Sequence, residues 1–248
     1  MVNIIKRNVV ERTVQVASDN VKLEGNLAIP ADVRAVVVFV PGSDSSRFSP
    51  STRYVADVLH ENGFATLLFE LLTPQEEESE LQTRHLSSDV NFLARRILGA
   101  CDWVAQQNQL RNLPFGYFGT NSGASAALLA AAQQQVQIGA VVARGEQSRL
   151  EPEVLANICA PTLFVVGASD TSAVENNQMV LEHLQCPKEL AIVPGASTLF
   201  QEREALEALA QLSLKWFQTH LVTETFESTL FEIWQKVSLT HEQYRTLH

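Results

Sequence analysis

The sequence is poor in cysteine and in basic residues, and it contains no long hydrophobic run. Its three cysteines, Cys101, Cys159 and Cys186, include no Cys-x-x-Cys pair, which argues against a disulfide framework and a zinc site. We expect them to be reduced and partly buried. Eighteen Lys and Arg against 28 Asp and Glu give a net charge of −10, which is unsuited to binding nucleic acid.

The lack of long hydrophobic runs indicates where in the cell the protein is expected. No apolar stretch approaches the roughly 20 residues that span a bilayer. Residues 1–7 (Met-Val-Asn-Ile-Ile-Lys-Arg) lack the apolar core of a signal peptide. The sequence therefore predicts a cytoplasmic protein without a membrane span.

The hydrophobic pattern of the 248 residues, 46% of which are apolar, predicts an α/β fold. Residues 13–16 and 22–29 alternate between apolar and polar, as in an antiparallel hairpin. Six short, continuously apolar runs follow, which is typical of strands buried on both faces: 35–40, 65–69, 115–118, 138–142, 162–166 and 190–193. Helical stretches between them, expected at 50–62, 88–107, 122–132, 172–184 and 202–220, predict a mostly parallel, doubly wound sheet after an antiparallel N-terminal hairpin.

One stretch is strongly acidic, the segment Gln75-Glu76-Glu77-Glu78-Ser79-Glu80. Nothing near it supplies complementary ligand spacing, so a solvated loop is expected rather than a metal site. No Gly-rich phosphate loop or other cofactor motif is present either. We therefore expect no cofactor and no metal.

Residues Gly119-Thr120-Asn121-Ser122-Gly123 have the spacing of a nucleophile elbow, the Gly-x-Ser-x-Gly turn that exposes a nucleophilic serine. The central position is asparagine. An elbow holds its central residue in strained backbone space, and asparagine is one of the few non-glycine residues that tolerates positive φ. Asn121 is thus predicted to keep the turn and lose the chemistry.

Over residues 9–221 the chain resembles the dienelactone-hydrolase-related branch of the α/β hydrolases. The resemblance rests on segments 40–47, 67–74, 83–86, 116–119, 161–167 and 194–200. It implies an α/β-hydrolase fold and a triad in the order Ser or Cys, Asp or Glu, His. The nucleophile position then falls on Asn121, the acid on Asp170 and the base on Thr198. In the loop that usually builds the oxyanion hole, Pro41 stands where a histidine is expected.

This pattern implies a degenerate triad. An asparagine amide cannot form an acyl-enzyme, and a threonine cannot cycle a proton near neutral pH. Loss of nucleophile or base alone typically costs roughly 10⁶ in kcat, so efficient hydrolysis is not expected. Ser122 is an alternative nucleophile only if the elbow shifts register, and Asp170 could instead cap the helix that follows it.

Further pocket or oxyanion-hole candidates are Pro41, Ser43, Arg47, Glu70, His85, Ser122 and Arg144. His85 could equally lie in a surface loop. Open α/β sheets bind ligands at the carboxyl edge of their strands. Convergence there of Arg47, Arg53, Arg84 and Arg144 would suit a carboxylate or a phosphate. A small carbonyl or carboxylate ligand is expected.

Residues 222–248 form an extension beyond the hydrolase-like domain of residues 1–221. One helical face carries Phe226, Leu230, Ile233, Trp234 and Val237. This stripe could pack on its own domain, or it could dock a protein partner or a second copy of the chain.

Three functional hypotheses follow. The first is a pseudoenzyme that keeps the fold for binding or protein interaction. The second is an enzyme with repurposed chemistry, an ester or lactone hydrolase, lyase or isomerase using Asn121 and the oxyanion hole. The third is a structural or assembly protein that docks through the C-terminal helix.

Overall fold

The computed structural model describes residues 8–18, 20–42, 45–83, 85–133, 137–145 and 150–222. The chain begins with the expected hairpin, in which β1 (Val9–Ser18) pairs antiparallel with β2 (Val21–Pro30). β1 forms one edge of the sheet, and most of its side chains are exposed.

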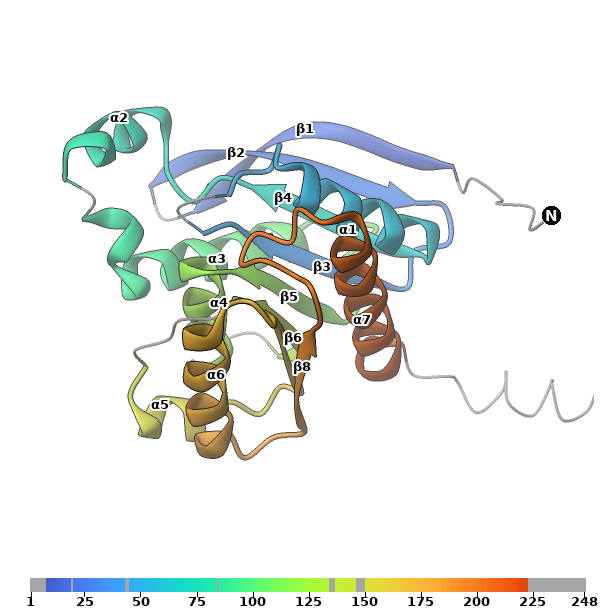
Figure 1. The fold of residues 1–248 in the computed structure, drawn as a ribbon. Coiled ribbons are helices and arrows are strands. Elements are labelled where there is room, and N and C mark those ends of the chain that lie inside the picture. The colour runs from blue at the N-terminus through green and yellow to red at the C-terminus, as the bar shows by residue number, and fades with distance from the viewer. Residues whose placement is uncertain are drawn as a thin grey trace, which may run out of the picture.

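The eight strands form one sheet in the order β1-β2-β4-β3-β5-β6-β7-β8 (Figure 1). β2 pairs antiparallel with β4, and the strands from β4 to β8 pair parallel. Every residue of β3, β4, β5 and β7 is buried, which is why these strands read as continuous apolar runs. The bounds are β3 (Ala35–Val40), β4 (Phe64–Phe69), β5 (Phe115–Thr120), β6 (Ile138–Arg144), β7 (Thr162–Gly167) and β8 (Lys188–Val193).

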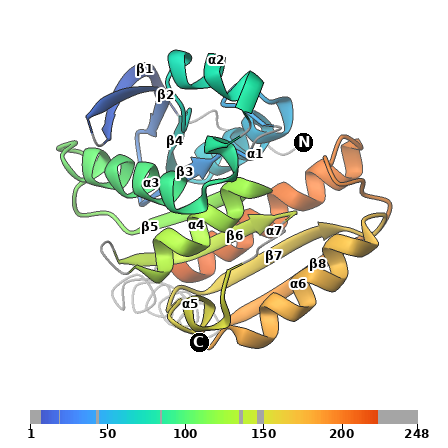
Figure 2. The same ribbon diagram turned by 90° about the vertical axis from the view of Figure 1, so that its left-hand side faces the viewer.

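Helices cover both faces of this sheet (Figure 2). One face carries α3 (Val90–Ala105), α4 (Ser122–Ala132), the short α5 (Pro152–Ala156) and α6 (Thr171–His183), and it encloses the larger hydrophobic core. The other face carries α1 (Pro50–Glu61) and α7 (Arg203–Leu221) over a second core. The expected helices are therefore confirmed, and α5 is an addition.

The acidic segment at 75–80 is not a loop, so the expectation for it was wrong. It forms α2 (Pro74–Thr83), which is followed by a short 3-10 helix, η1 (Leu86–Ser88). Thr73 and Glu76 form a capping box: Glu76 N donates to Thr73 Oγ1 at 3.2 Å, and Thr73 N donates to Glu76 Oε2 at 2.8 Å. Pro74, at the first helical position, favours the same start. No cluster of potential metal ligands occurs among the described residues.

The three cysteines are free thiols at different depths: Cys101 is buried, Cys186 is half-buried and Cys159 is exposed. Within the described ranges, none of the helices is both long and apolar enough to cross a membrane. The amphipathic stripe expected at Phe226, Leu230, Ile233, Trp234 and Val237 lies outside the described residues, so the extension and the domain boundary at 221 stay predictions.

Candidate functional site

Asn121 forms the turn between the inner strand β5 and α4. Its backbone has φ 49° and ψ −121°. Asn121 is one of two non-glycine residues with positive φ in the described chain. This is the expected strained conformation, and the turn lies at the carboxyl edge of the sheet, where open α/β folds place their ligands.

The two glycines of the motif are required by close packing. A Cβ on Gly119 would lie 2.5 Å from the Cα of Ala124, and one on Gly123 would collide with the carbonyl oxygens of Val40 and Pro41. The start of α4 is thereby held directly against the loop that follows β3. The five-residue spacing thus reflects the geometry of an elbow.

The elbow is also joined to the end of β6. Asn121 N donates to the carbonyl oxygen of Arg144 at 2.9 Å. A Cβ on Gly145 would lie only 2.6 Å from Asn121 Oδ1, so the asparagine side chain lies over this glycine.

Asp170 and Thr198 are brought together from the ends of β7 and β8. Asp170 Oδ1 accepts hydrogen bonds from Ala173 N and Ser172 Oγ, each at 3.0 Å, so Asp170 caps α6. Thr198 Oγ1 donates to Asp170 Oδ2 at 2.8 Å. The hydrogen bond from Ala173 N, with those from Thr198 and Ser172, holds the pKa of Asp170 below its usual value.

The loop after β3 is tied to the end of β5 by hydroxyl groups. Gly42 N donates to Ser45 Oγ at 2.9 Å and to Thr120 Oγ1 at 3.0 Å. The two hydroxyl oxygens are 2.8 Å apart. The Gly42 amide is therefore used inside the protein, and Ser43, the expected oxyanion-hole residue, lies outside the described residues.

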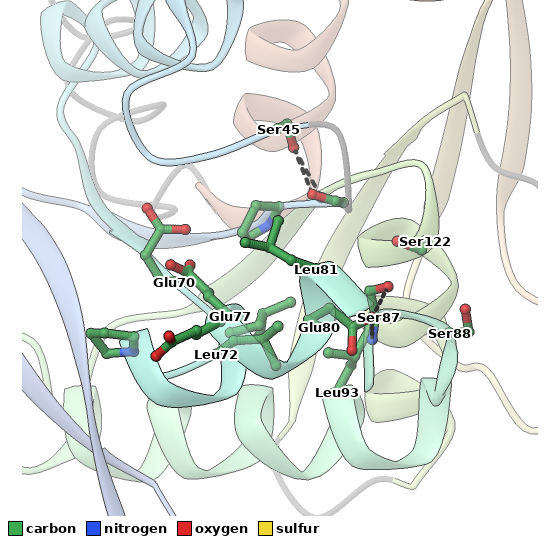
Figure 3. Close-up of a pocket in the computed structure, with 15 residues that line it drawn as sticks. Ser45, Glu70, Leu72, Glu77, Glu80, Leu81, Ser87, Ser88, Leu93 and Ser122 are labelled. Atoms are coloured by element: carbon green, nitrogen blue, oxygen red, sulfur yellow. Dashed lines mark hydrogen bonds between the residues drawn. The ribbon is translucent and has the colours of Figure 1, made fainter. Parts of the chain in front are cut away.

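A cavity of about 930 Å³ opens beside the elbow (Figure 3). Three of the expected pocket residues, Pro41, Glu70 and Ser122, line it. The sequence reasoning missed the wall formed by α2 and η1, although the capping box at Thr73 was a usable signal for α2. The full lining is Pro41, Gly42, Ser45, Glu70, Leu71, Leu72, Pro74, Glu77, Glu78, Glu80, Leu81, Ser87, Ser88, Leu93 and Ser122.

The arginines expected to converge on a ligand are used elsewhere. Buried Arg47 pairs with Glu24 at 2.6 Å and with Glu70 at 3.9 Å. Arg53 pairs with Glu11 at 3.0 Å, and Arg144 Nη1 donates to the carbonyl oxygen of Leu199 at 3.1 Å. Arg84 lies outside the described residues. Arg47, Arg53, Arg144 and the exposed His85 are not lining residues of the cavity.

Glu70 and Glu80 are both held by the protein. Burial raises the pKa of Glu70, although Arg47 N donates to its Oε1 at 3.3 Å and opposes the shift. Glu80 accepts from Ser87 Oγ at 2.5 Å, from Ser87 N at 2.9 Å and from Leu86 N at 2.8 Å. Desolvation opposes ionisation of Glu80, but these hydrogen bonds outweigh it and lower the pKa.

Comparison with known proteins gives the family. A dienelactone hydrolase from Anabaena variabilis is 47% identical in sequence, with 86% of this chain and 99% of that chain covered and a TM-score of 0.83. A dienelactone hydrolase-like promiscuous phosphotriesterase from metagenomic libraries superposes with a TM-score of 0.69 at 15% identity, over 86% of this chain and 98% of that one. The chain belongs to the dienelactone hydrolase family and has the α/β-hydrolase fold.

Curated relatives carry a different name. A Mycobacterium tuberculosis protein called "Putative phosphoribosyl transferase" is 43% identical over 211 residues. The match covers 85% of this chain but only 47% of the relative, so the chain spans about half the length of the curated relatives it matches. No family model matches the chain.

Proposed function

We propose that this chain is a non-hydrolytic member of its family, which keeps the cavity to bind a ligand. The observation that carries the proposal is the hydrogen bond between Thr198 and Asp170. A triad acid orients and stabilises a histidine that takes the proton of the nucleophile. Here the group bound to the acid is a hydroxyl, which is not a base near neutral pH.

The turn at Asn121 supports the same proposal. Its backbone conformation and its tight packing are those of an elbow, but the side chain is an amide and lies over Gly145. Asn121 is not a lining residue of the cavity, whereas its neighbour Ser122 is. We infer that the elbow is kept because it shapes the site.

The cavity supports binding as the retained activity. It reaches Pro41 and Gly42 in the loop after β3 and Ser122 in the elbow. These two segments surround a substrate carbonyl in this fold. Of the two ligand groups expected from the sequence, the carboxylate is the less suited to this cavity. Arg47 and Arg144, which would suit a carboxylate, bind Glu24 and Leu199 instead.

Hydrolysis of short p-nitrophenyl esters and lactones tests the proposal. We expect the full chain to match the buffer background, and to match Asn121→Ala and Ser122→Ala prepared in parallel. Turnover well above background that either substitution removes would overturn the proposal. Turnover that survives both would indicate a contaminating esterase, and repetition after a further purification step must then return it to background if the proposal holds.

Glu70 favours a second candidate, a repurposed lyase or isomerase. It is a carboxyl group in a cavity wall with a pKa raised by burial, a property suited to proton transfer. Incubation with small lactones and ketones in deuterated water would show exchange of the protons next to the carbonyl. Exchange that Glu70→Gln abolishes would support this candidate, and no exchange would count against it.

The third hypothesis, docking through residues 222–248, also stays a proposal. Deletion of residues 223–248 should change oligomeric state or partner capture if it holds. Phosphoribosyl transfer, the activity in the name of the Mycobacterium tuberculosis relatives, is not proposed for this chain. Phosphoribosyl transfer requires groups that bind a pyrophosphate, and four of the lining residues of this cavity are glutamates.

A further inference from the structure

The charge of the cavity wall is one-sided. Four glutamates line it, Glu70, Glu77, Glu78 and Glu80, and no Lys, Arg or His is found among the described lining residues. The guanidinium of Arg47 is shared between Glu24 and Glu70 and so offsets only one of these two carboxylates. The described part of the wall therefore presents an excess of negative charge to a ligand in the cavity.

Two of these carboxylates are available to a ligand. Glu80 is used by Ser87 and Leu86, and Glu70 by Arg47. The side chains of Glu77 and Glu78 are exposed on α2 and form no hydrogen bond or ion pair with the described residues. Their neighbour Glu76, by contrast, pairs with Arg96 at 2.8 Å.

Glu70 and Glu77 are close enough for their charges to repel each other. They come from different segments, the end of β4 and the first turns of α2, and Figure 3 shows both on the same side of the cavity, away from Ser122. After burial, the charge of Glu77 is among the causes that raise the pKa of Glu70. A cation placed beside the two carboxylates would relieve this repulsion.

Apolar side chains complete the wall. Leu71, Leu72 and Leu93 line the cavity, and so does Leu81 of α2, which is 85% exposed. Together the four leucines give the cavity an apolar wall, which favours a ligand with a hydrocarbon portion. A bare metal ion does not fit, because the described residues form no cluster that could hold one and leucine offers it no ligand.

We propose that the cavity binds an organic cation with an apolar portion, an amine or quaternary ammonium compound whose charge lies near Glu70, Glu77 and Glu78. This inference rests on the proposed binding function and specifies its ligand class. It departs from the small carbonyl or carboxylate ligand expected from the sequence, because the described arginines do not line the cavity and glutamates do.

Calorimetric titration of the full chain with three compounds of one chain length tests the inference: hexyltrimethylammonium, hexanamide and hexanoate. The cation should bind at least about tenfold more tightly than the amide, and hexanoate most weakly. Equal affinity for all three would overturn the cation proposal and leave the binding function standing. Failure of all three compounds to bind would overturn both the cation proposal and the binding function. Binding of hexanoate alone would overturn the proposed ligand class.

Paired variants locate the effect. Glu77→Gln with Glu78→Gln should bring the affinity for the cation close to that for the amide and leave the amide unchanged. Glu175→Gln with Glu182→Gln, two exposed carboxylates on α6 that do not line the cavity, removes the same charge and should change neither affinity. An equal loss in both double variants would show nonspecific attraction to an acidic surface and overturn the proposal.

Discussion

Thr198 Oγ1 donates a hydrogen bond of 2.8 Å to Asp170 Oδ2, and it joins the loop after β8 to the start of α6. The same carboxylate caps α6 through Ala173 N. One aspartate thus holds two segments at the carboxyl edge of the sheet. Asp170 therefore has a structural role, and its removal is expected to affect stability.

Replacement of Thr198 by valine should lower the free energy of unfolding by about 0.5–1.5 kcal/mol, because Asp170 Oδ2 loses its donor. Partial exposure of the pair places the effect near the lower end. Thr198→Ser keeps the hydroxyl and serves as the control. Urea denaturation measures the stability of both variants. Equal stability of Thr198→Val and the unchanged protein would contradict a stabilising role for the hydrogen bond between Thr198 and Asp170.

Asp170 should also make stability depend on acid pH. Its pKa is lowered in the folded protein by the hydrogen bonds from Ala173 N, Thr198 and Ser172. Its stabilising contribution is therefore complete above the unfolded pKa near 3.8 and is lost as the pH falls through the lower folded value. The stability difference between the unchanged protein and Asp170→Asn should be constant above about pH 5 and shrink below it. A difference that grows in acid would be the opposite result.

Two neighbouring glutamates on α2 should behave differently. Glu76 pairs with Arg96, which is 3% exposed, and also closes the capping box with Thr73. Glu76→Ala should therefore cost about 1–3 kcal/mol. Exposed Glu77 has neither contact, and Glu77→Ala should change stability by less than about 0.5 kcal/mol. Thermal or urea unfolding compares the two, and equal costs would refute this account of how α2 is anchored.

His60 should make the protein less stable below neutral pH. Its Nε2 lies 2.6 Å from the buried Thr66 hydroxyl, and burial lowers the pKa of the imidazole despite nearby Asp57 and Glu11. The unfolded chain then binds a proton at a pH at which the folded protein does not, so stability declines as the pH falls from 6.5 toward the folded pKa. His60→Gln should reduce this decline, and an unchanged pH profile would show that His60 is not its source.

The strands and most helices could be predicted because burial on both faces leaves a local signal. The run Ala35-Val36-Val37-Val38-Phe39-Val40 becomes β3 without change of bounds. The elbow could also be predicted, because the close packing that requires Gly119 and Gly123 leaves two glycines at a fixed spacing in the sequence. α2 was missed because its acidic composition indicated a loop, although Thr73 and Glu76 have the spacing of a capping box.

The cavity wall could not be predicted in the same way. It depends on how α2 and η1 fold back toward the loop after β3, and this depends on long-range contacts such as Arg96 with Glu76. The same applies to the arginines. Arg47 and Arg144 do lie near the carboxyl edge of the sheet, but Glu24 and the Leu199 carbonyl, both distant in sequence, take up their hydrogen bonds.

The most direct test of the central claim restores the two missing groups. We expect the unchanged protein, Asn121→Ser and Thr198→His to hydrolyse p-nitrophenyl acetate at the background rate. The double variant Asn121→Ser with Thr198→His, with Asp170 in place to orient the imidazole, should exceed that rate by about 10²-fold or more. Hydrolysis by the unchanged protein as fast as by the double variant would contradict the claim that Asn121 and Thr198 have ended triad chemistry in this chain.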